Sequence, residues 1–238
     1  LFRPVVESIL AQSIKPEAIY LNLPDKFRGQ ATYSIPDWLP GHACIRSNRA
    51  VKEDWGPIMK LLPVLSRETD PDTIILTIDD DVIFPPEALT SFVEATRRQP
   101  ATAFCSMGFR FAEDTGHILP VRGHLKACHG LQGFSGCCYR RAHFDEAALK
   151  IAVRELPKEF QINDDIILSN HLASRGVRRA TVQFPSGRLE FTEWSDNDPH
   201  ALKSAGPGTH ARYQQIRKYL QARNRWHLTD RSRRNKEP

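Results

Sequence analysis

TIILTIDDD, at residues 73–81, is the stretch of sequence that decides the fold. Its first six residues form a continuous run rich in β-branched side chains, which predicts a central strand buried on both faces. The run leads directly into Asp79, Asp80 and Asp81, and two prolines and a helical pattern follow. The acidic triplet is therefore expected at the carboxyl end of a core strand, where open α/β sheets bind their ligands.

On both sides of this stretch, apolar residues alternate between the helical and the strand period, which predicts an α/β protein. We expect one Rossmann-like domain over residues 1–222, with a central, mostly parallel sheet flanked by helices, and a basic, flexible tail over residues 223–238. The glycine-rich residues 108–136 are expected to form a long, irregular excursion. Helices are predicted around residues 6–10, 57–65, 89–96, 163–175 and 213–220, and further strands at residues 18–23, 101–107, 137–140 and 177–184.

The composition excludes some classes of protein. No stretch of the chain approaches the roughly 20 apolar residues of a transmembrane helix. The five cysteines are odd in number and include no Cys-x-x-Cys pair, so we expect buried thiols in a cytoplasmic protein rather than a disulfide framework or a zinc ribbon. The predicted tail carries six basic and two acidic side chains. Such a tail can contact a membrane surface or nucleic acid, although a solvated end is the simpler interpretation and the case for nucleic acid is weak.

The acidic triplet carries the strongest chemical signal. Three adjacent carboxylates repel one another, so a bound cation would stabilise them. Oxygen ligands suit Mg²⁺ or Mn²⁺, which complete their coordination with water and phosphate. Such an ion would offset the diphosphate charge of a nucleotide donor and help the leaving group depart. The alternative is a solvated acidic turn, which the apolar strand before the triplet disfavours.

Two further segments point to a ligand site. Gly133, Ser135 and Gly136 belong to a segment whose paired glycines let the backbone approach a ligand closely, although an ordinary turn into a strand would look similar. Asp164 and Asp165 begin a predicted helix. A carboxylate there can act as a general base that takes a proton from an acceptor hydroxyl, and the alternative is plain stabilisation of the helix dipole.

In this order, the three elements resemble the GT-A fold of family-2-type glycosyltransferases, over residues 3–185. PVVESILAQS, at residues 4–13, is similar to the first helix of that family, which ends in Leu-x-Gln-(Ser/Thr), and the first strand of the family would precede Arg3. Asp79 and Asp81 match the carboxylates of the DxD motif. The motif of processive synthases, Gln-x-x-Arg-Trp, does not occur, so the resemblance favours a transferase that adds a single sugar.

The resemblance implies a metal-dependent enzyme that moves a sugar from a nucleoside-diphosphate sugar, with a UDP-sugar as the expected donor, to a hydroxyl of a glycan or other acceptor with inversion. Asp79 and Asp81 would hold Mn²⁺ or Mg²⁺, with His210 as a candidate third ligand. Asp80 and Lys60 would lie beside the nucleotide, where the lysine can reach uracil or diphosphate.

The same resemblance assigns the other site residues. Gly133, Ser135 and Gly136 would line the donor sugar and the acceptor, and either Asp164 or Asp165 would be the catalytic base, with a slight preference for Asp164. Two alternatives remain open at this point. One is a nucleotidyltransferase of similar fold, and the other is a non-catalytic module that binds a glycan or nucleic acid.

Overall fold

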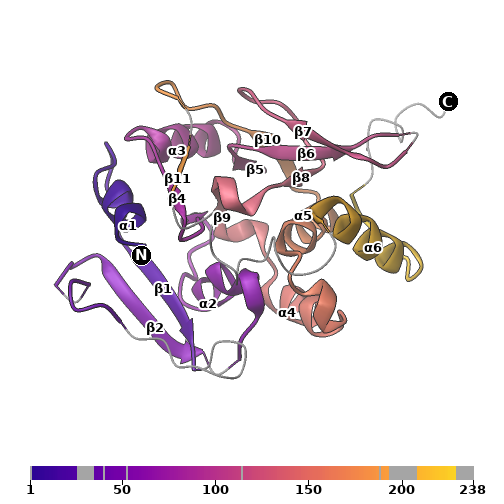
Figure 1. The fold of residues 1–238 in the computed structure, drawn as a ribbon, viewed down its shortest axis with the longest axis horizontal. Coiled ribbons are helices and arrows are strands. Elements are labelled where there is room, and N and C mark those ends of the chain that lie inside the picture. Colours follow the sequence, from indigo (N-terminus) through magenta and orange to yellow (C-terminus); the bar gives the residue numbers. More distant parts are fainter. Residues whose placement is uncertain are drawn as a thin grey trace.

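The structure is a computed structural model that describes residues 2–25, 35–39, 41–51, 53–113, 115–187, 189–192 and 208–228. Over these residues the protein is a mixed α/β domain with four small sheets (Figure 1). The strands are β1 (Ile19–Pro24), β2 (Ile45–Val51), β3 (Ile74–Thr77), β4 (Val82–Ile83), β5 (Thr102–Cys105), β6 (Gly108–Phe111), β7 (Ile118–Val121), β8 (Gly130–Leu131), β9 (Cys137–Arg140), β10 (Arg178–Thr181) and β11 (Glu190–Phe191). The α-helices are α1 (Arg3–Leu10), α2 (Leu62–Leu65), α3 (Ala88–Arg98), α4 (Glu146–Arg154), α5 (Asp164–Ser174) and α6 (Thr209–Gln221). Short 3-10 helices are η1 (Gly56–Lys60), η2 (Gly133–Ser135), η3 (Arg141–His143) and η4 (Lys158–Phe160).

The central sheet has four strands in the order β10, β5, β9, β3. β10 runs parallel to β5, whereas β9 runs antiparallel to both β5 and β3. The α/β class is confirmed, and the described central sheet is mixed: β3, β5 and β10 run in one direction and β9 runs in the other. The reason is the path of β9, because the chain leaves the sheet after β5, forms a separate sheet, and re-enters between β5 and β3 in the opposite direction.

β3 is the strand predicted at the start of the acidic triplet, and the triplet follows its carboxyl end as expected. Its burial differs from the prediction. Ile75 and Thr77 are buried, but Ile74 and Leu76 are only partly buried. Among the described strands β3 pairs only with β9, so it lies at the edge of the described central sheet. Ile74 and Leu76 share one face of the strand, so the predicted full burial holds for the face of Ile75 and Thr77 and is incomplete on the other.

Helices cover the two faces of the central sheet. Successive residues of a strand point to opposite faces, and Phe104 of β5 accordingly belongs to one apolar core whereas Cys105 belongs to the other. α3 packs on β5 and β9, where the rings of Phe92 and Phe184 meet edge-on with centroids 5.3 Å apart. α2, α4 and α5 build the second core. None of the described helices is long and apolar enough to cross a membrane.

The glycine-rich residues 108–136 include a small antiparallel sheet with the strand order β7, β6, β8, so the predicted irregular excursion is wrong. The packing around Gly130 explains why β8 contains a glycine. A Cβ atom at this position would lie 2.1 Å from Cζ of Phe109. The glycine therefore permits a close approach of an aromatic ring to the strand, and does not mark a turn.

Gln12, just after α1, fixes the position of α3 relative to α1. Its side chain is completely buried. The Nε2 atom donates to the carbonyl oxygen of Pro85 at 2.8 Å, and Oε1 accepts from the backbone N–H of Leu89 at 2.9 Å. The glutamine of the segment at residues 4–13 thus pairs buried backbone groups, and holds in place the chain that follows the acidic triplet.

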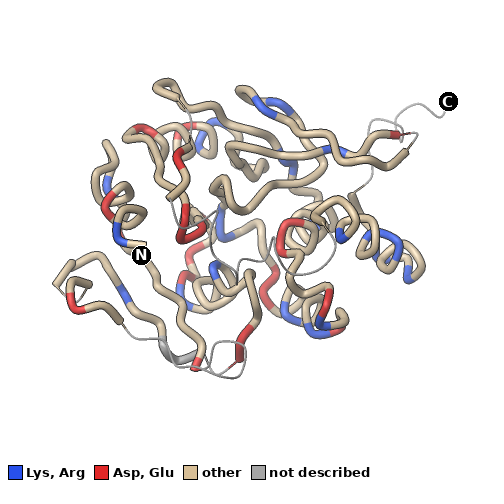
Figure 2. Tube along the Cα trace, in the orientation of Figure 1, with Lys and Arg blue, Asp and Glu red and all other residues tan. Residues whose placement is uncertain are grey.

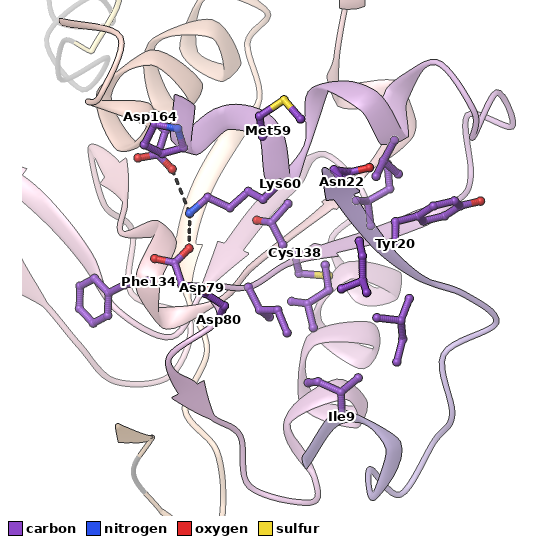
Figure 3. Close-up of a pocket in the computed structure, with 18 of the residues that line it drawn as sticks. Ile9, Tyr20, Asn22, Met59, Lys60, Asp79, Asp80, Phe134, Cys138 and Asp164 are labelled. Carbon is purple, nitrogen blue, oxygen red and sulfur yellow. Dashed lines mark hydrogen bonds and ion pairs between the residues drawn. The ribbon is translucent and has the colours of Figure 1, made fainter. Parts of the chain in front are cut away.

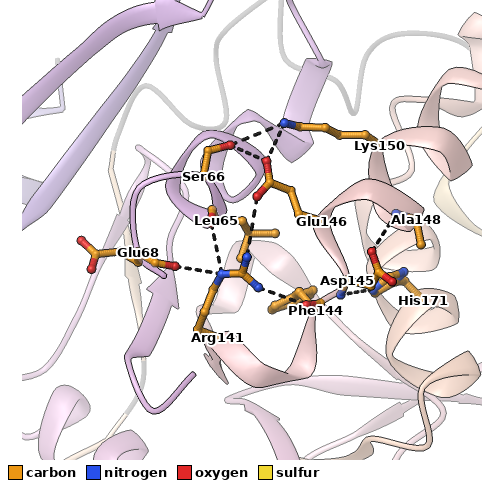
Figure 4. Close-up of polar contacts among 10 residues, drawn as sticks. All are labelled: Leu65, Ser66, Glu68, Arg141, Phe144, Asp145, Glu146, Ala148, Lys150 and His171. Carbon is orange, nitrogen blue, oxygen red and sulfur yellow. Dashed lines mark hydrogen bonds and ion pairs between the residues drawn. The ribbon is translucent and has the colours of Figure 1, made fainter. Parts of the chain in front are cut away.

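Arg141 fastens α2 to the chain that follows β9 (Figure 4). Its Nε donates to the carbonyl oxygens of Leu65 at 3.1 Å and Glu68 at 2.8 Å. Its Nη1 donates to the carbonyl oxygen of Phe144 at 3.0 Å. Because α2 continues the chain from η1, this network also supports the 3-10 helix that ends at Lys60.

All five cysteines are free thiols, and Cys105, Cys128, Cys137 and Cys138 are buried. This confirms the prediction of buried thiols for four of the five. Burial raises the pKa of Cys138 to about 12, so its thiol stays protonated at neutral pH.

The predicted flexible tail begins too early. Arg225 Nη1 lies 2.7 Å from Glu155 Oε2, and the backbone N–H of His227 donates to Asn170 Oδ1 at 2.7 Å. Leu228 is 3% exposed. Residues 223–228 therefore pack on α4 and α5 as part of the domain, and the rest of the predicted tail lies outside the described residues.

Candidate functional site

A cavity of about 2140 Å³ runs along β3 and ends at the acidic triplet. Figure 3 shows its two ends. Lys60, Asp79 and Asp164 lie at one end, and residues of α1 and β1, such as Ile9 and Tyr20, lie at the other. The charged end is the candidate active site, because it contains both acidic features that the sequence predicts.

Lys60 joins the acidic triplet to the acidic pair. Its ammonium group donates to Asp79 Oδ1, and its Nζ lies 3.0 Å from Asp164 Oδ2 (Figure 3). The side chains of Lys60 and Asp164 are 15% and 12% exposed, and that of Asp79 is 32% exposed. The three residues come from η1, from the end of β3 and from the start of α5, so the tertiary structure alone brings them together.

The electrostatics of this contact keep the lysine charged. Burial by itself would lower the pKa of Lys60, but the negative charges of Asp164 and Asp79 outweigh this and hold it well above its usual range. One ammonium group thus attracts two carboxylates and offsets their mutual repulsion across the site.

The acidic triplet is crowded with negative charge. Burial, together with the charges of Asp79 and Asp81, raises the pKa of Asp80. The backbone N–H of Thr192 donates to the carbonyl oxygen of Asp81 at 3.0 Å, which ties the triplet to β11. A cation near these carboxylates would relieve the crowding, and their oxygen chemistry suits a divalent ion of the Mg²⁺ type.

Asp165 lies beside Asp164 and has its own partners. Oδ1 accepts from the backbone N–H of Gly133 at 2.6 Å, and Oδ2 accepts from the hydroxyl of Tyr213. Burial and the neighbouring Asp164 raise the pKa of Asp165 to about 7, although both hydrogen bonds act in the opposite direction. The site therefore contains a carboxyl group that changes charge near neutral pH.

The glycine-containing segment reaches the site through one residue. A Cβ atom on Gly133 would lie 2.9 Å from Lys60 Nζ and 3.0 Å from Asp165 Oδ1, so any larger residue here would force the charged side chains to shift. Ser135 does not face the cavity: it is completely buried, and its hydroxyl donates to the carbonyl oxygen of Gln132 at 2.8 Å. Gly136 has φ +79° and packs against the ring of Phe84. Ser135 and Gly136 therefore shape the turn, and only Gly133 lies against the acids.

His210 is not brought to the acidic triplet. It lies near the start of α6, with its ring centroid 4.6 Å from that of His117, and its Nδ1 accepts from the backbone N–H of Ile118 at 3.4 Å. In the part of the chain that the structure describes, no group of three His, Cys, Asp or Glu side chains is arranged to hold a metal ion. A divalent ion held by two carboxylates, water and phosphate does not need a third protein ligand.

Three residues of the site had no signal in the sequence. Tyr213 is recognisable only as an apolar position of an amphipathic helix, yet its hydroxyl bonds to Asp165. Phe134 and Phe191 line the cavity with ring centroids 6.0 Å apart. The helix that supplies Tyr213 carries basic but no acidic side chains (Figure 2), which places positive charge close to the acidic site.

No family model matches the chain, and no curated protein matches it.

Proposed function

We propose that the protein is a metal-dependent glycosyltransferase of the GT-A type, which transfers a sugar from a nucleoside-diphosphate sugar to an acceptor hydroxyl with inversion. One observation carries the proposal: Lys60 holds Asp79 of the triplet and Asp164 of the acidic pair around one cavity end. If Asp79 lay in a solvated turn and Asp164 only stabilised a helix end, nothing would require the two carboxylates to lie close together. Their shared contact with Lys60 supports a single site in which the two carboxylates have different functions.

Asp79 and Asp81 are the residues that would hold Mg²⁺ or Mn²⁺, because their carboxylate oxygens suit such ions and the triplet is already crowded with negative charge. When bound, the ion supplies positive charge against the diphosphate of the leaving nucleotide. Lys60 has a positioning role in this proposal. Its ammonium group keeps two carboxylates at a fixed separation and adds a second positive charge beside the diphosphate.

Asp165 is the residue that we propose as the general base. A base works best when its pKa lies near the operating pH, and the pKa of Asp165 is raised to about 7. In the reaction, the acceptor hydroxyl gives its proton to Asp165 while its oxygen bonds to the anomeric carbon. The bond from that carbon to the diphosphate oxygen breaks, and the electron pair leaves with the nucleotide. Asp164 positions Lys60, so the slight preference for Asp164 as the base is revised.

Calorimetric titration of UDP into the protein, with and without Mn²⁺, tests the metal–nucleotide site. We expect binding to be at least about tenfold tighter with Mn²⁺, which is about 1.4 kcal/mol, and Asp81→Ala to remove the difference. Glu94→Ala is the matched control, because Glu94 lies on α3 with a 55% exposed side chain and pairs only with Arg98. Equal UDP binding with and without Mn²⁺ would count against the proposal.

Turnover assays separate the proposed enzyme from the other classes. UDP release from UDP-sugars in the presence of sugar acceptors supports a glycosyltransferase. Pyrophosphate release from a nucleoside triphosphate and a sugar phosphate would indicate a nucleotidyltransferase instead. Asp165→Asn is expected to reduce kcat by about 100-fold or more with little change in the KM for the donor. A variant that loses only donor binding would show that Asp165 is structural.

A further inference from the structure

Two phenylalanine rings line the cavity and take no part in the apolar cores of the described residues. Phe134 and Phe191 have ring centroids 6.0 Å apart and planes inclined by 39°. Phe191 is 50% exposed, and Phe134 is half-buried. An aromatic side chain stabilises a fold mainly through burial, so folding alone does not explain a ring that is held open beside a group of carboxylates.

The backbone of β11 fixes Phe191 next to the acidic triplet. Phe191 pairs with Val82, which directly follows Asp81, in the two-stranded sheet of β4 and β11. The next residue, Thr192, donates to the carbonyl oxygen of Asp81 twice, from its backbone N–H at 3.0 Å and from its hydroxyl at 3.3 Å. The position of Phe191 is therefore set by the same segment that carries the proposed metal ligands.

The second ring is fixed next to the acidic pair. Phe134 follows Gly133, whose backbone N–H donates to Asp165 Oδ1 at 2.6 Å. Figure 3 shows Phe134 at the charged end of the cavity, near Asp79. The two rings thus connect the two acidic features of the site, because Phe191 is tied to the triplet and Phe134 is tied to the proposed base.

A sugar ring matches this combination of surfaces. A pyranose carries apolar patches of C–H groups on its faces and hydroxyl groups around its rim. The C–H groups suit the electron-rich face of an aromatic ring, and the hydroxyl groups can donate to the carboxylates nearby. An acyl chain would match the rings only, because it would remove water from the carboxylates without bonding to them. A nucleobase can also stack on an aromatic ring, but Asp165 marks the part of the site that the acceptor, and not the nucleotide, has to reach.

We propose that Phe134 and Phe191 form an aromatic platform on which a sugar ring of the acceptor stacks, so that the acceptor is a carbohydrate with one hydroxyl directed at Asp165. The role of this sugar as the acceptor rests on the proposed function, whereas its binding to the platform can be measured without any reaction. Phe191 makes the larger contribution to binding, because its ring is 50% exposed and a ligand can cover it. Stacking also fixes the plane of the sugar, which orients the reacting hydroxyl.

Binding of free sugars tests the platform. The probes are the methyl β-glycosides of glucose, galactose and N-acetylglucosamine, added to the full chain without nucleotide and followed by saturation-transfer NMR. We expect at least one glycoside to bind, with the strongest transfer to the ring C–H protons of one face. Phe191→Ala should weaken this binding at least about tenfold. Phe191→Leu should also weaken it, because leucine is apolar but has no aromatic face, and Phe191→Trp should retain it.

The control variant is Ile151→Ala. Ile151 is 54% exposed on α4 and is not among the described residues that line the cavity, so this variant should bind the glycosides as the unmodified protein does. Equal binding by the unmodified protein, Phe191→Ala and Phe191→Leu would overturn the platform, and so would a failure of all the glycosides to bind. A loss of UDP affinity in Phe191→Ala as large as the loss of sugar affinity would also overturn it, because the rings would then hold the nucleobase.

Turnover distinguishes this inference from the proposed function. If a glycoside binds through Phe191 but no UDP-sugar is turned over, the platform stands as a sugar-binding surface and the proposed transferase is wrong. If UDP-sugar is turned over and Phe191→Ala leaves the KM for the acceptor unchanged, the transferase stands and the platform is wrong. An acceptor KM that rises at least about tenfold in Phe191→Ala, with the donor KM unchanged, supports both.

Discussion

The unmodified protein is expected to lose stability as the pH rises from about 5 to about 8. The substitution Asp165→Asn is expected to remove this loss. The pKa of this carboxyl is raised from 3.8 to about 7 in the folded protein, first by burial and then by the charge of Asp164. Between these two values the folded state holds a proton that the unfolded state has released. Stability from this group is therefore fully present below about pH 4 and is lost as the pH rises through about 7.

The size of the effect follows from the shift. One pKa unit corresponds to about 1.4 kcal/mol, so the group would contribute about 2.7 kcal/mol at pH 5 and almost nothing at pH 8. We expect about 1–2 kcal/mol, because Asp165 is only partly buried and water screens its charge. Asparagine keeps the shape and can still accept from Gly133, but it does not ionise.

Urea unfolding followed by tryptophan fluorescence, at steps between pH 5 and pH 8, measures this difference. His171 titrates in the opposite sense, because burial lowers its pKa to about 4, but its contribution is the same in both proteins and cancels. The free energy of unfolding of the unmodified protein should fall by about 1–2 kcal/mol relative to the variant as the pH rises. Parallel curves for the two proteins would refute a raised pKa at Asp165.

Three further substitutions test the packing of the site. Lys60→Met should lower the free energy of unfolding by about 2–4 kcal/mol, because it leaves two largely buried carboxylates without their cation, and Lys60→Arg should lose less in the same urea assay. Gly133→Ala should lower the free energy of unfolding by about 1–2 kcal/mol, because the added Cβ would collide with the charged cluster. The control is Gly208→Ala, where the added Cβ has open space around it, and this variant should not be destabilised. Tyr213→Phe removes a hydrogen bond that lowers the pKa of Asp165, so the pH at which stability is lost should move upward, and an unchanged midpoint would show that the hydroxyl does not bond to the carboxylate.

The local pattern of apolar and polar residues was sufficient to predict most of the helices and strands. The apolar run before the acidic triplet became β3, the helix predicted at residues 163–175 became α5, and Gly176 has φ +76° at the end of that helix as a C′ glycine does. These features depend on backbone geometry over a few residues, so sequence periodicity reports them directly. The failure was at residues 108–136, where strand pairing across many residues decides the structure.

The sequence by itself determined which residues carry charge at the end of β3 and at the start of α5, and its apolar pattern predicted the α/β class. The tertiary structure alone decided that Lys60 bridges Asp79 and Asp164, and that Tyr213 bonds to Asp165 from a helix 48 positions away. It also decided that, among the described strands, β3 pairs only with β9. The physical reason is the same in each case. A residue's own type and its neighbours fix the local conformation, whereas burial, charge pairing and strand neighbours depend on which distant segments pack together.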